Sequence, residues 1–192
     1  MSKTLVTLNV NDATYEVAIK PQDTLALALR DGCGLTGTKI GCDMGTCGCC
    51  TVLVDGEPAL GCLTLALEVE GRRIQTIEGL AGAERLHPLQ RAFAECGGSQ
   101  CGFCTPGFVM TSVALLRTNK APSRDEIKAA IAGNLCRCTG YAKIVDAVEH
   151  AAEQIRDADD SIPTPNETSE TQAGDKDDAG IHGRRQPATA GR

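Results

Sequence analysis

The eleven cysteines of this 192-residue chain constrain its fold more than any other feature. All of them fall between Cys33 and Cys138. The start of the chain has no basic segment followed by an apolar stretch, as a secretion signal has, so we expect a cytoplasmic protein. In a reducing compartment, clustered thiols seldom persist as disulfides and usually bind metal or carry out redox chemistry. The cysteines therefore predict metal or redox sites.

The first group of cysteines lies in and just after a glycine-rich loop. Cys42, Cys47 and Cys50 follow the spacing C-x4-C-x2-C, and Cys62 arrives from a later segment. This is the ligand spacing of plant-type [2Fe–2S] clusters, whereas zinc sites usually use C-x2-C pairs about 12–20 residues apart. Glycines let the backbone N–H groups of such a loop face an anionic cluster along a tight path. The spacing therefore predicts a [2Fe–2S] cluster.

The second group consists of a C-x2-C pair, Cys101 and Cys104, and a C-x-C pair, Cys136 and Cys138. Four thiolates suit an iron–sulfur cluster or a structural zinc ion, and the spacing alone leaves both open. Cys104 immediately precedes a predicted helix, so we expect the helix dipole to lower the pKa of this thiol.

The period of the hydrophobic residues changes from two to about 3.6 near residue 88. Before this point, the sequence predicts a β-hairpin over residues 3–19, a short helix over 24–31 capped by Thr24, and strands over 51–54 and 73–77. After it, four helices are expected over 88–96, 106–117, 124–134 and from about 141, the second with Thr105 as its capping hydroxyl and the third with a capping box of Ser123 and Glu126. The helices are expected to bury Val109, Ser112, Val113, Leu116, Ile127, Ala130, Ile131, Leu135, Ile144, Val145, Val148, Ala152 and Ile155.

Several function classes conflict with the composition. A net charge of −6 argues against a nucleic-acid partner, and the longest apolar runs are far shorter than the ~20 residues of a transmembrane helix. We find no phosphate-binding loop and no nucleophile–base pair, and we expect the three histidines, His87, His150 and His182, to be surface residues. The sequence therefore favours electron transfer over catalysis on a substrate.

Three strings carry a resemblance to a known family: LTGTKIGC at residues 35–42, QCGFCTPG at 100–107 and GNLCRCTGY at 133–141. They resemble the iron–sulfur subunit of the xanthine oxidase family of molybdenum hydroxylases. The resemblance extends from the first strand to about Ala158. It implies an α+β protein with a ferredoxin-like β-grasp domain over residues 1–80 and a four-helix-bundle [2Fe–2S] domain over 81–158. The polar, partly acidic composition of residues 159–192 predicts a disordered tail.

The same resemblance implies a ligand set and a set of partners. The two [2Fe–2S] clusters would be held by Cys42, Cys47, Cys50 and Cys62, and by Cys101, Cys104, Cys136 and Cys138. Gln100 matches the glutamine that contacts the pterin, and Cys138 also lies close to it in the family. The molybdenum–pterin cofactor belongs to a separate large subunit and FAD to a medium subunit, in an αβγ or (αβγ)2 complex. The chain would relay electrons between them and hold no substrate site.

Two other functions compete with the electron-relay subunit. A stand-alone two-cluster ferredoxin or redox sensor would have solvated surfaces around both clusters, whereas Gln100 and the apolar Phe103, Phe108 and Val109 suggest a partner surface. A structural zinc module would be colourless.

Three cysteines are left over from the two ligand sets. Cys49 stands where the family usually has alanine, and we keep Cys47 and Cys50 as ligands because their spacing requires it. Cys33 and Cys96 are expected to be small buried apolar residues.

Overall fold

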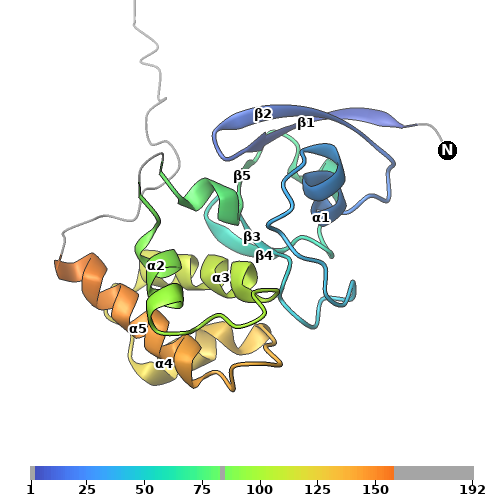
Figure 1. The fold of residues 1–192 in the computed structure, drawn as a ribbon. Helices are drawn as coiled ribbons and strands as arrows, with labels where there is room; N and C mark the ends of the chain where they lie inside the picture. Colours follow the sequence, from blue (N-terminus) through green and yellow to red (C-terminus); the bar gives the residue numbers. More distant parts are fainter. Residues whose placement is uncertain (1–2, 83–84, 158–192) are drawn as a thin grey trace, which may run out of the picture.

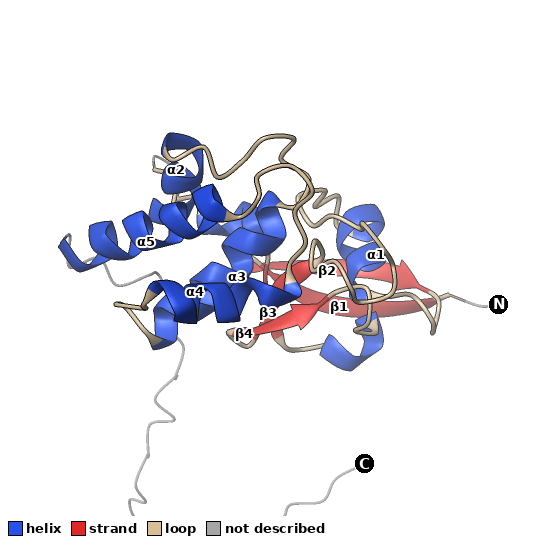
Figure 2. Cartoon of the chain, turned by 90° about the horizontal axis from the view of Figure 1, so that it is seen from below, coloured by secondary structure: helices blue, strands red, loops and turns tan. Residues whose placement is uncertain are grey.

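The computed structural model describes residues 3–82 and 85–157, and the predicted tail over 159–192 lies outside this range. It shows a mixed α+β protein in which a five-stranded sheet lies beside a group of helices (Figures 1 and 2). We call residues 3–82 the sheet half and residues 85–157 the helical half. In the described residues no helix is long and apolar enough to cross a membrane.

The sheet has the strand order β2-β1-β5-β3-β4. Strands β1 (Thr4–Val10) and β2 (Ala13–Ile19) form the predicted hairpin, with Asn11 and Asp12 at positive φ in its two-residue turn. Strand β5 (Arg73–Gln75) is parallel to β1 and antiparallel to β3 (Thr51–Val54). Strand β4 (Glu57–Leu60) pairs with β3 across the turn at Asp55 and Gly56.

The predicted helix over 24–31 is present in a modified form. Thr24 caps it by accepting a hydrogen bond from the Leu27 amide at 3.4 Å. Helix α1 (Leu25–Leu27) then widens into a π-helical turn over Ala28–Gly32. Leu25 and Leu29 are fully buried against the sheet, in a core shared with the inward residues of both hairpin strands.

Four helices make up the helical half: α2 (Pro88–Glu95), α3 (Thr105–Thr118), α4 (Arg124–Ala130) and α5 (Ala142–Asp157). The capping box of Ser123 and Glu126 is present as predicted. Most of the predicted apolar stripes of α3, α4 and α5 are buried in one core.

Three details of the helical prediction are wrong. Helix α3 begins one residue early, because Cys104 is its N-cap and Thr105 its first residue, whose hydroxyl bonds to Ser99 at 3.0 Å. Leu135 is 52% exposed because α4 ends at Ala130 and the chain leaves the helical path after a short 3-10 turn over Ile131–Gly133. Ala130 is only half-buried.

The two halves are joined through α3, which packs on β3 and β4. Figures 1 and 2 show α3 beside these strands, with the β1–β2 hairpin at the opposite edge of the sheet. Leu53 of β3 is fully buried, and it belongs to the core of the helices rather than to that of the sheet. The structure therefore brings the two cysteine-bearing loops to the same seam.

Candidate iron–sulfur centres

The first group of thiols lies in the loop between α1 and β3 and just after β4. Its members form two pairs, Cys42 with Cys47 and Cys50 with Cys62, whose side chains interact. The Cys62 amide also points at the Cys50 sulfur, with the nitrogen and sulfur 3.5 Å apart. A Cβ atom on Gly41 would lie 3.1 Å from the Cys47 sulfur, so the backbone there passes directly over a thiol. This is the close approach for which the glycine-rich loop was predicted.

Burial and hydrogen bonding give the thiols of the first group different pKa values. Cys50 and Cys62 are 1% and 6% exposed, and burial raises the pKa of Cys50 to about 12. Hydrogen bonds from the side chain of Thr46, the backbone at Met44 and the side chain of Cys47 lower the pKa of Cys42 to about 6. Cys42 therefore favours the thiolate form by itself, whereas Cys50 needs a nearby metal cation to stabilise its thiolate.

The additional cysteine of this loop is buried beside the predicted ligands. Cys49 is 5% exposed, and its sulfur lies 3.8 Å from the Cys47 carbonyl oxygen. Burial and the neighbouring thiol of Cys47 raise the pKa of Cys49 to about 12. Cys33 and Cys96, expected to be buried, are half-buried, and each packs against the edge of a core.

The second group also consists of two pairs. The sulfurs of Cys101 and Cys138 are 3.6 Å apart, and the side chain of Cys104 contacts that of Cys136. Two thiolates on one tetrahedral metal ion, with metal–sulfur bonds of about 2.3 Å, would stand ~3.8 Å apart. A two-iron cluster, in which each iron takes two of the four cysteines, matches thiols arranged in pairs.

The electrostatics of the second group correct one prediction. Burial and the contact with Cys136 raise the pKa of Cys104 to about 12, so the expected lowering by the helix dipole is wrong. At this half-buried thiol, desolvation and the neighbouring Cys136 outweigh the partial charge of the helix end. For Cys136, burial acts in the same direction, but the side chain and backbone of Thr139 donate to its sulfur and leave its pKa lowered.

Sequence reasoning did not single out the residues that surround Cys136. The Thr139 hydroxyl and amide lie 3.1 and 3.4 Å from the Cys136 sulfur. The Tyr141 hydroxyl accepts a hydrogen bond from the Cys136 amide at 3.0 Å, and its ring packs edge-on against Phe108. The signal was the string T-G-Y directly after the last cysteine, because its two hydroxyls, three and five residues after Cys136, can reach back to that residue.

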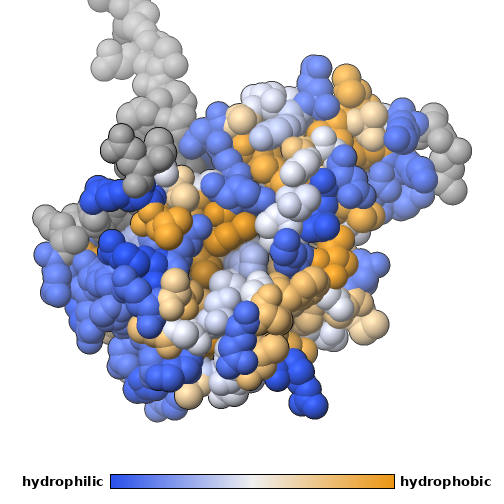
Figure 3. Space-filling view, in the orientation of Figure 1, coloured by the Kyte–Doolittle hydropathy of each residue, from blue (hydrophilic) through white to orange (hydrophobic). Residues whose placement is uncertain are grey.

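The two sites differ in their access to solvent. Cys101 and Cys138 are exposed, as are Gln100, Phe103 and Leu135 beside them, the last two at 46% and 52%. Phe108 and Val109, which we expected on a partner surface, are instead in the core. On the face shown in Figure 3, apolar patches interrupt an otherwise hydrophilic surface.

The histidines do not join either site. His87, expected at the surface, is 4% exposed and caps α2 by accepting the Leu89 amide at 3.2 Å. Burial and the nearby Arg117 lower its pKa to about 4, so the ring is neutral. His150 is partly exposed beside Glu95, and His182 lies outside the described residues.

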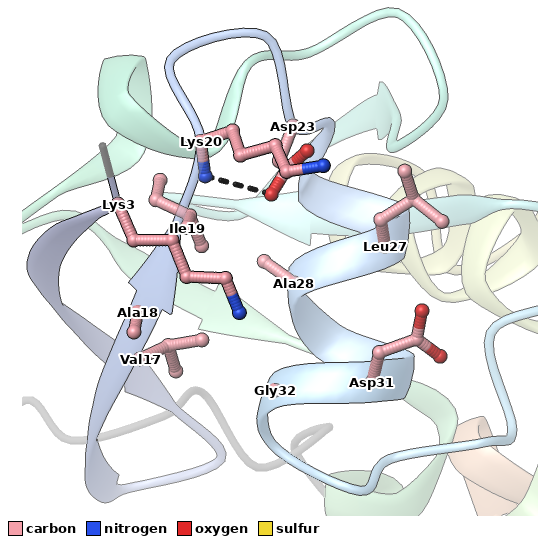
Figure 4. Close-up of a pocket in the computed structure, with 10 residues that line it drawn as sticks. All are labelled: Lys3, Val17, Ala18, Ile19, Lys20, Asp23, Leu27, Ala28, Asp31 and Gly32. Carbon is pink, nitrogen blue, oxygen red and sulfur yellow. Dashed lines mark hydrogen bonds between the residues drawn. The ribbon is translucent and has the colours of Figure 1, made fainter. Parts of the chain in front are cut away.

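A groove of about 300 Å³ lies between β2 and α1 (Figure 4). Its lining includes Lys3, Lys20, Asp23 and Asp31, and Asp23 accepts a hydrogen bond from the Lys20 amide at 2.8 Å. No predicted ligand lines it.

The comparisons with known proteins agree with this geometry. A model of the 2Fe-2S iron-sulfur cluster binding domain matches residues 8–80, and one of a [2Fe-2S] binding domain matches residues 76–149. The nicotine 6-hydroxylase small subunit of Paenarthrobacter nicotinovorans is 47% identical over 150 residues, 78% of this chain and 90% of that protein. Caffeine dehydrogenase subunit gamma of Pseudomonas sp. (strain CBB1) is also 47% identical, over 78% of this chain and 91% of the relative. The crystal structure of quinoline 2-oxidoreductase from Pseudomonas putida 86 matches with a TM-score of 0.78 and 46% identity, over 82% of this chain and 98% of the matched one.

These findings define an electron-transfer protein with two [2Fe–2S] domains. The chain belongs to the small iron–sulfur subunits of the xanthine oxidase family of molybdenum hydroxylases. It is therefore the iron–sulfur component of a molybdenum-containing oxidoreductase rather than a stand-alone ferredoxin.

Proposed function

We propose that this chain carries electrons between a molybdenum–pterin site on a large subunit and FAD on a medium subunit, through two clusters held by named thiols. Cys42, Cys47, Cys50 and Cys62 would hold the first cluster, and Cys101, Cys104, Cys136 and Cys138 the second. The arrangement of both thiol groups in pairs carries this assignment, because each iron of a [2Fe–2S] cluster takes two of the four protein ligands. When bound, the clusters would supply one-electron transfer.

The residues of the chain contribute binding and tuning rather than substrate chemistry. The buried Cys50 and Cys62 would keep water from their side of the first cluster, and Thr139 would donate hydrogen bonds to a ligand of the second. Hydrogen bonds to sulfur and solvent exposure are the main means by which a protein adjusts the potential of such a cluster. The relatives named for nicotine and for caffeine are both 47% identical to this chain, which supports substrate selection by another subunit.

We assign the exposed side of the second site to the large subunit. Gln100 and Cys138 lie there and would approach the pterin, while Phe103 and Leu135 would lose their exposure in the contact. A complex of composition αβγ or (αβγ)2 in the cytoplasm is part of this proposal. The sheet half would be the β-grasp domain over residues 1–80, and the four helices a bundle over 81–158. Separate hydrophobic cores for the sheet and the helices support this division.

The test is metal and sulfide analysis of the anaerobically purified complex, with electron paramagnetic resonance (EPR) after dithionite reduction. We expect about four irons per chain and two distinct signals, as two [2Fe–2S] clusters require. Zinc in place of the second signal would contradict the assignment of a second [2Fe–2S] cluster to Cys101, Cys104, Cys136 and Cys138. A chain that purifies alone when co-expressed with the genes of its complex would contradict the subunit role.

A further inference from the structure

The two cysteine loops are in direct contact at the seam between the halves. The Leu135 amide donates to the Cys47 carbonyl oxygen at 2.9 Å. Next to it, the Asn134 side-chain amide donates to the Gly48 carbonyl oxygen, also at 2.9 Å, although the two residues are 86 positions apart. Gly48 follows the predicted ligand Cys47, and Asn134 lies two residues before the predicted ligand Cys136. One side chain therefore connects the backbones that carry ligands of both clusters.

The orientation of this side chain is fixed at both ends. A carbonyl oxygen can only accept, so the amide nitrogen of Asn134 must face Gly48. The amide oxygen of Asn134 accepts from the Thr111 hydroxyl at 3.0 Å, and Asn134 is 3% exposed. Buried side-chain amides with both ends satisfied hold one geometry, because any rotation leaves a polar group unpaired.

The backbone segments around Asn134 are closely packed against one another. A Cβ atom on Gly48 would lie 2.5 Å from the Gly133 carbonyl oxygen, and one on Gly107 would lie 2.3 Å from the Gly48 carbonyl oxygen. Gly48 also has a φ of +67°, a conformation that favours glycine. The Thr51 hydroxyl and amide also donate to the Gly48 carbonyl oxygen, at 2.7 and 3.2 Å. The loop of the first site is thus seated on α3 and the loop of the second.

We propose that Asn134 is a positioning residue for electron transfer between the two clusters. It fixes the separation and orientation of the two loops, on which the rate of electron exchange and the magnetic interaction between reduced clusters both depend. The inference rests on the proposed ligand sets, since it concerns the distance between the groups that they hold. Asn134 need not contact either cluster to act in this way.

The test compares four forms of the intact complex: wild type, Asn134→Ala, Thr111→Val and Val148→Ala. Val148 is a fully buried residue of α5 and takes no part in the hydrogen bonds described at the seam, so its truncation serves as a destabilised control. For each form, we would measure iron content, melting temperature, both midpoint potentials, the magnetic interaction between the reduced clusters, and the rate of intercluster electron transfer after rapid reduction.

We expect Asn134→Ala to keep about four irons and two signals, while the magnetic interaction weakens and intercluster transfer slows several-fold. Thr111→Val should change both in the same direction by less, and it serves as the test if Asn134→Ala does not assemble. Val148→Ala should lower the melting temperature and leave both quantities unchanged.

An Asn134→Ala complex with wild-type interaction and rate, and with only a lower melting temperature, would overturn the inference and leave Asn134 a structural residue. A wild-type complex with fewer irons or a single signal would instead overturn the proposed ligand sets, and the inference with them. The two failures are therefore separate observations.

Discussion

The sheet half and the helical half of this chain surround their thiols in opposite ways. Cys50 and Cys62 lie inside the protein, whereas Cys101 and Cys138 lie at its surface beside exposed apolar side chains. The loop of the first site supplies Cys42, Cys47 and Cys50, Cys62 follows β4, and Gly48 of the loop lies against the loop of the second site. The second site has exposed thiols beside Phe103 and Leu135, on the side that we propose faces another subunit. An electron carrier must shield its clusters from solvent and also bring a cluster close to its partner. The comparison suggests that the sheet half would meet the first need and the helical half the second.

The largest effect should come from removing one ligand at each site. Cys50→Ala should lose the first cluster and Cys138→Ala the second, each leaving about two irons and one EPR signal. Cys50→Ala should also lower the melting temperature more, because its thiol is buried in the loop that packs on the helices. Iron analysis and thermal unfolding measure both effects. Equal destabilisation by the two variants would remove the contrast between the sites.

Acid should weaken the helical half specifically. Among the described residues, His87 is a buried histidine, and its pKa of about 4 lies below the 6.5 of an exposed histidine. The folded state then binds fewer protons than the unfolded state between these values, so the stabilisation is complete above pH 6.5 and is lost as the pH falls towards 4. We expect this group alone to cost about 2 kcal/mol of unfolding free energy between pH 7.5 and pH 5.

The matched variant for this prediction is His87→Asn, which retains a capping side chain but does not titrate. Denaturant unfolding of both proteins at the two pH values gives the difference. A His87→Asn protein with the same loss between pH 7.5 and pH 5 as wild type would assign the loss to the carboxylates instead.

A smaller effect should separate the potentials of the two clusters. Thr139→Val removes the hydroxyl that lies 3.1 Å from the Cys136 sulfur and keeps the shape of the side chain. Hydrogen bonds to a ligand sulfur stabilise the reduced cluster, so the midpoint potential of the second cluster should fall, by at most about 60 mV if a whole hydrogen bond is lost. The first cluster should keep its potential.

EPR-monitored redox titration follows both signals at once, and Thr139→Ser, which retains the hydroxyl, is the control. A shift of both signals in Thr139→Val would point to a general change in fold rather than to the lost hydrogen bond.

The smallest effect is expected at Cys49. Cys49→Ala restores the residue that the family usually has, and it should leave about four irons per chain, because the C-x4-C-x2-C spacing assigns the cluster to its neighbours. Iron and sulfide analysis is sufficient. Loss of iron from this variant would mean that Cys49 replaces Cys47 or Cys50 as a ligand.

The sequence predicts local features of the fold well, because short-range chemistry determines them. The alternation of Val6, Leu8 and Val10 and the turn at Asn11 and Asp12 specify the hairpin. Thr24 and Ser123 mark the starts of two helices through their own hydroxyls. For the sites, cysteine spacing separates the thiols into the two groups seen in the structure but does not give the pairs of the second group, in which Cys101 lies against Cys138 and Cys104 against Cys136.

The features that sequence reasoning missed depend on contacts between distant segments. His87 is buried because α2 carries it inward beside Arg117, and its own neighbours in the sequence contain no sign of this. The pKa of Cys104 depends on desolvation by the fold as a whole, whereas only the nearby helix end was visible in the sequence. Leu135 keeps helical spacing with Ile127 and Ile131, yet the chain departs from the helix before reaching it.

The contact of Gly107 with the Gly48 carbonyl oxygen also limits how such chains can be recombined. A sheet half taken from another redox protein would join these helices only if its loop left the same bare backbone at this point, since one methyl group on either glycine meets a carbonyl oxygen at 2.3 or 2.5 Å. We therefore expect a hybrid protein joined near residue 80 to fold only if Gly48, Gly107 and Asn134 are retained, although all three lie far from the junction in the sequence. In this sense the two halves fit one another closely, although each has its own core.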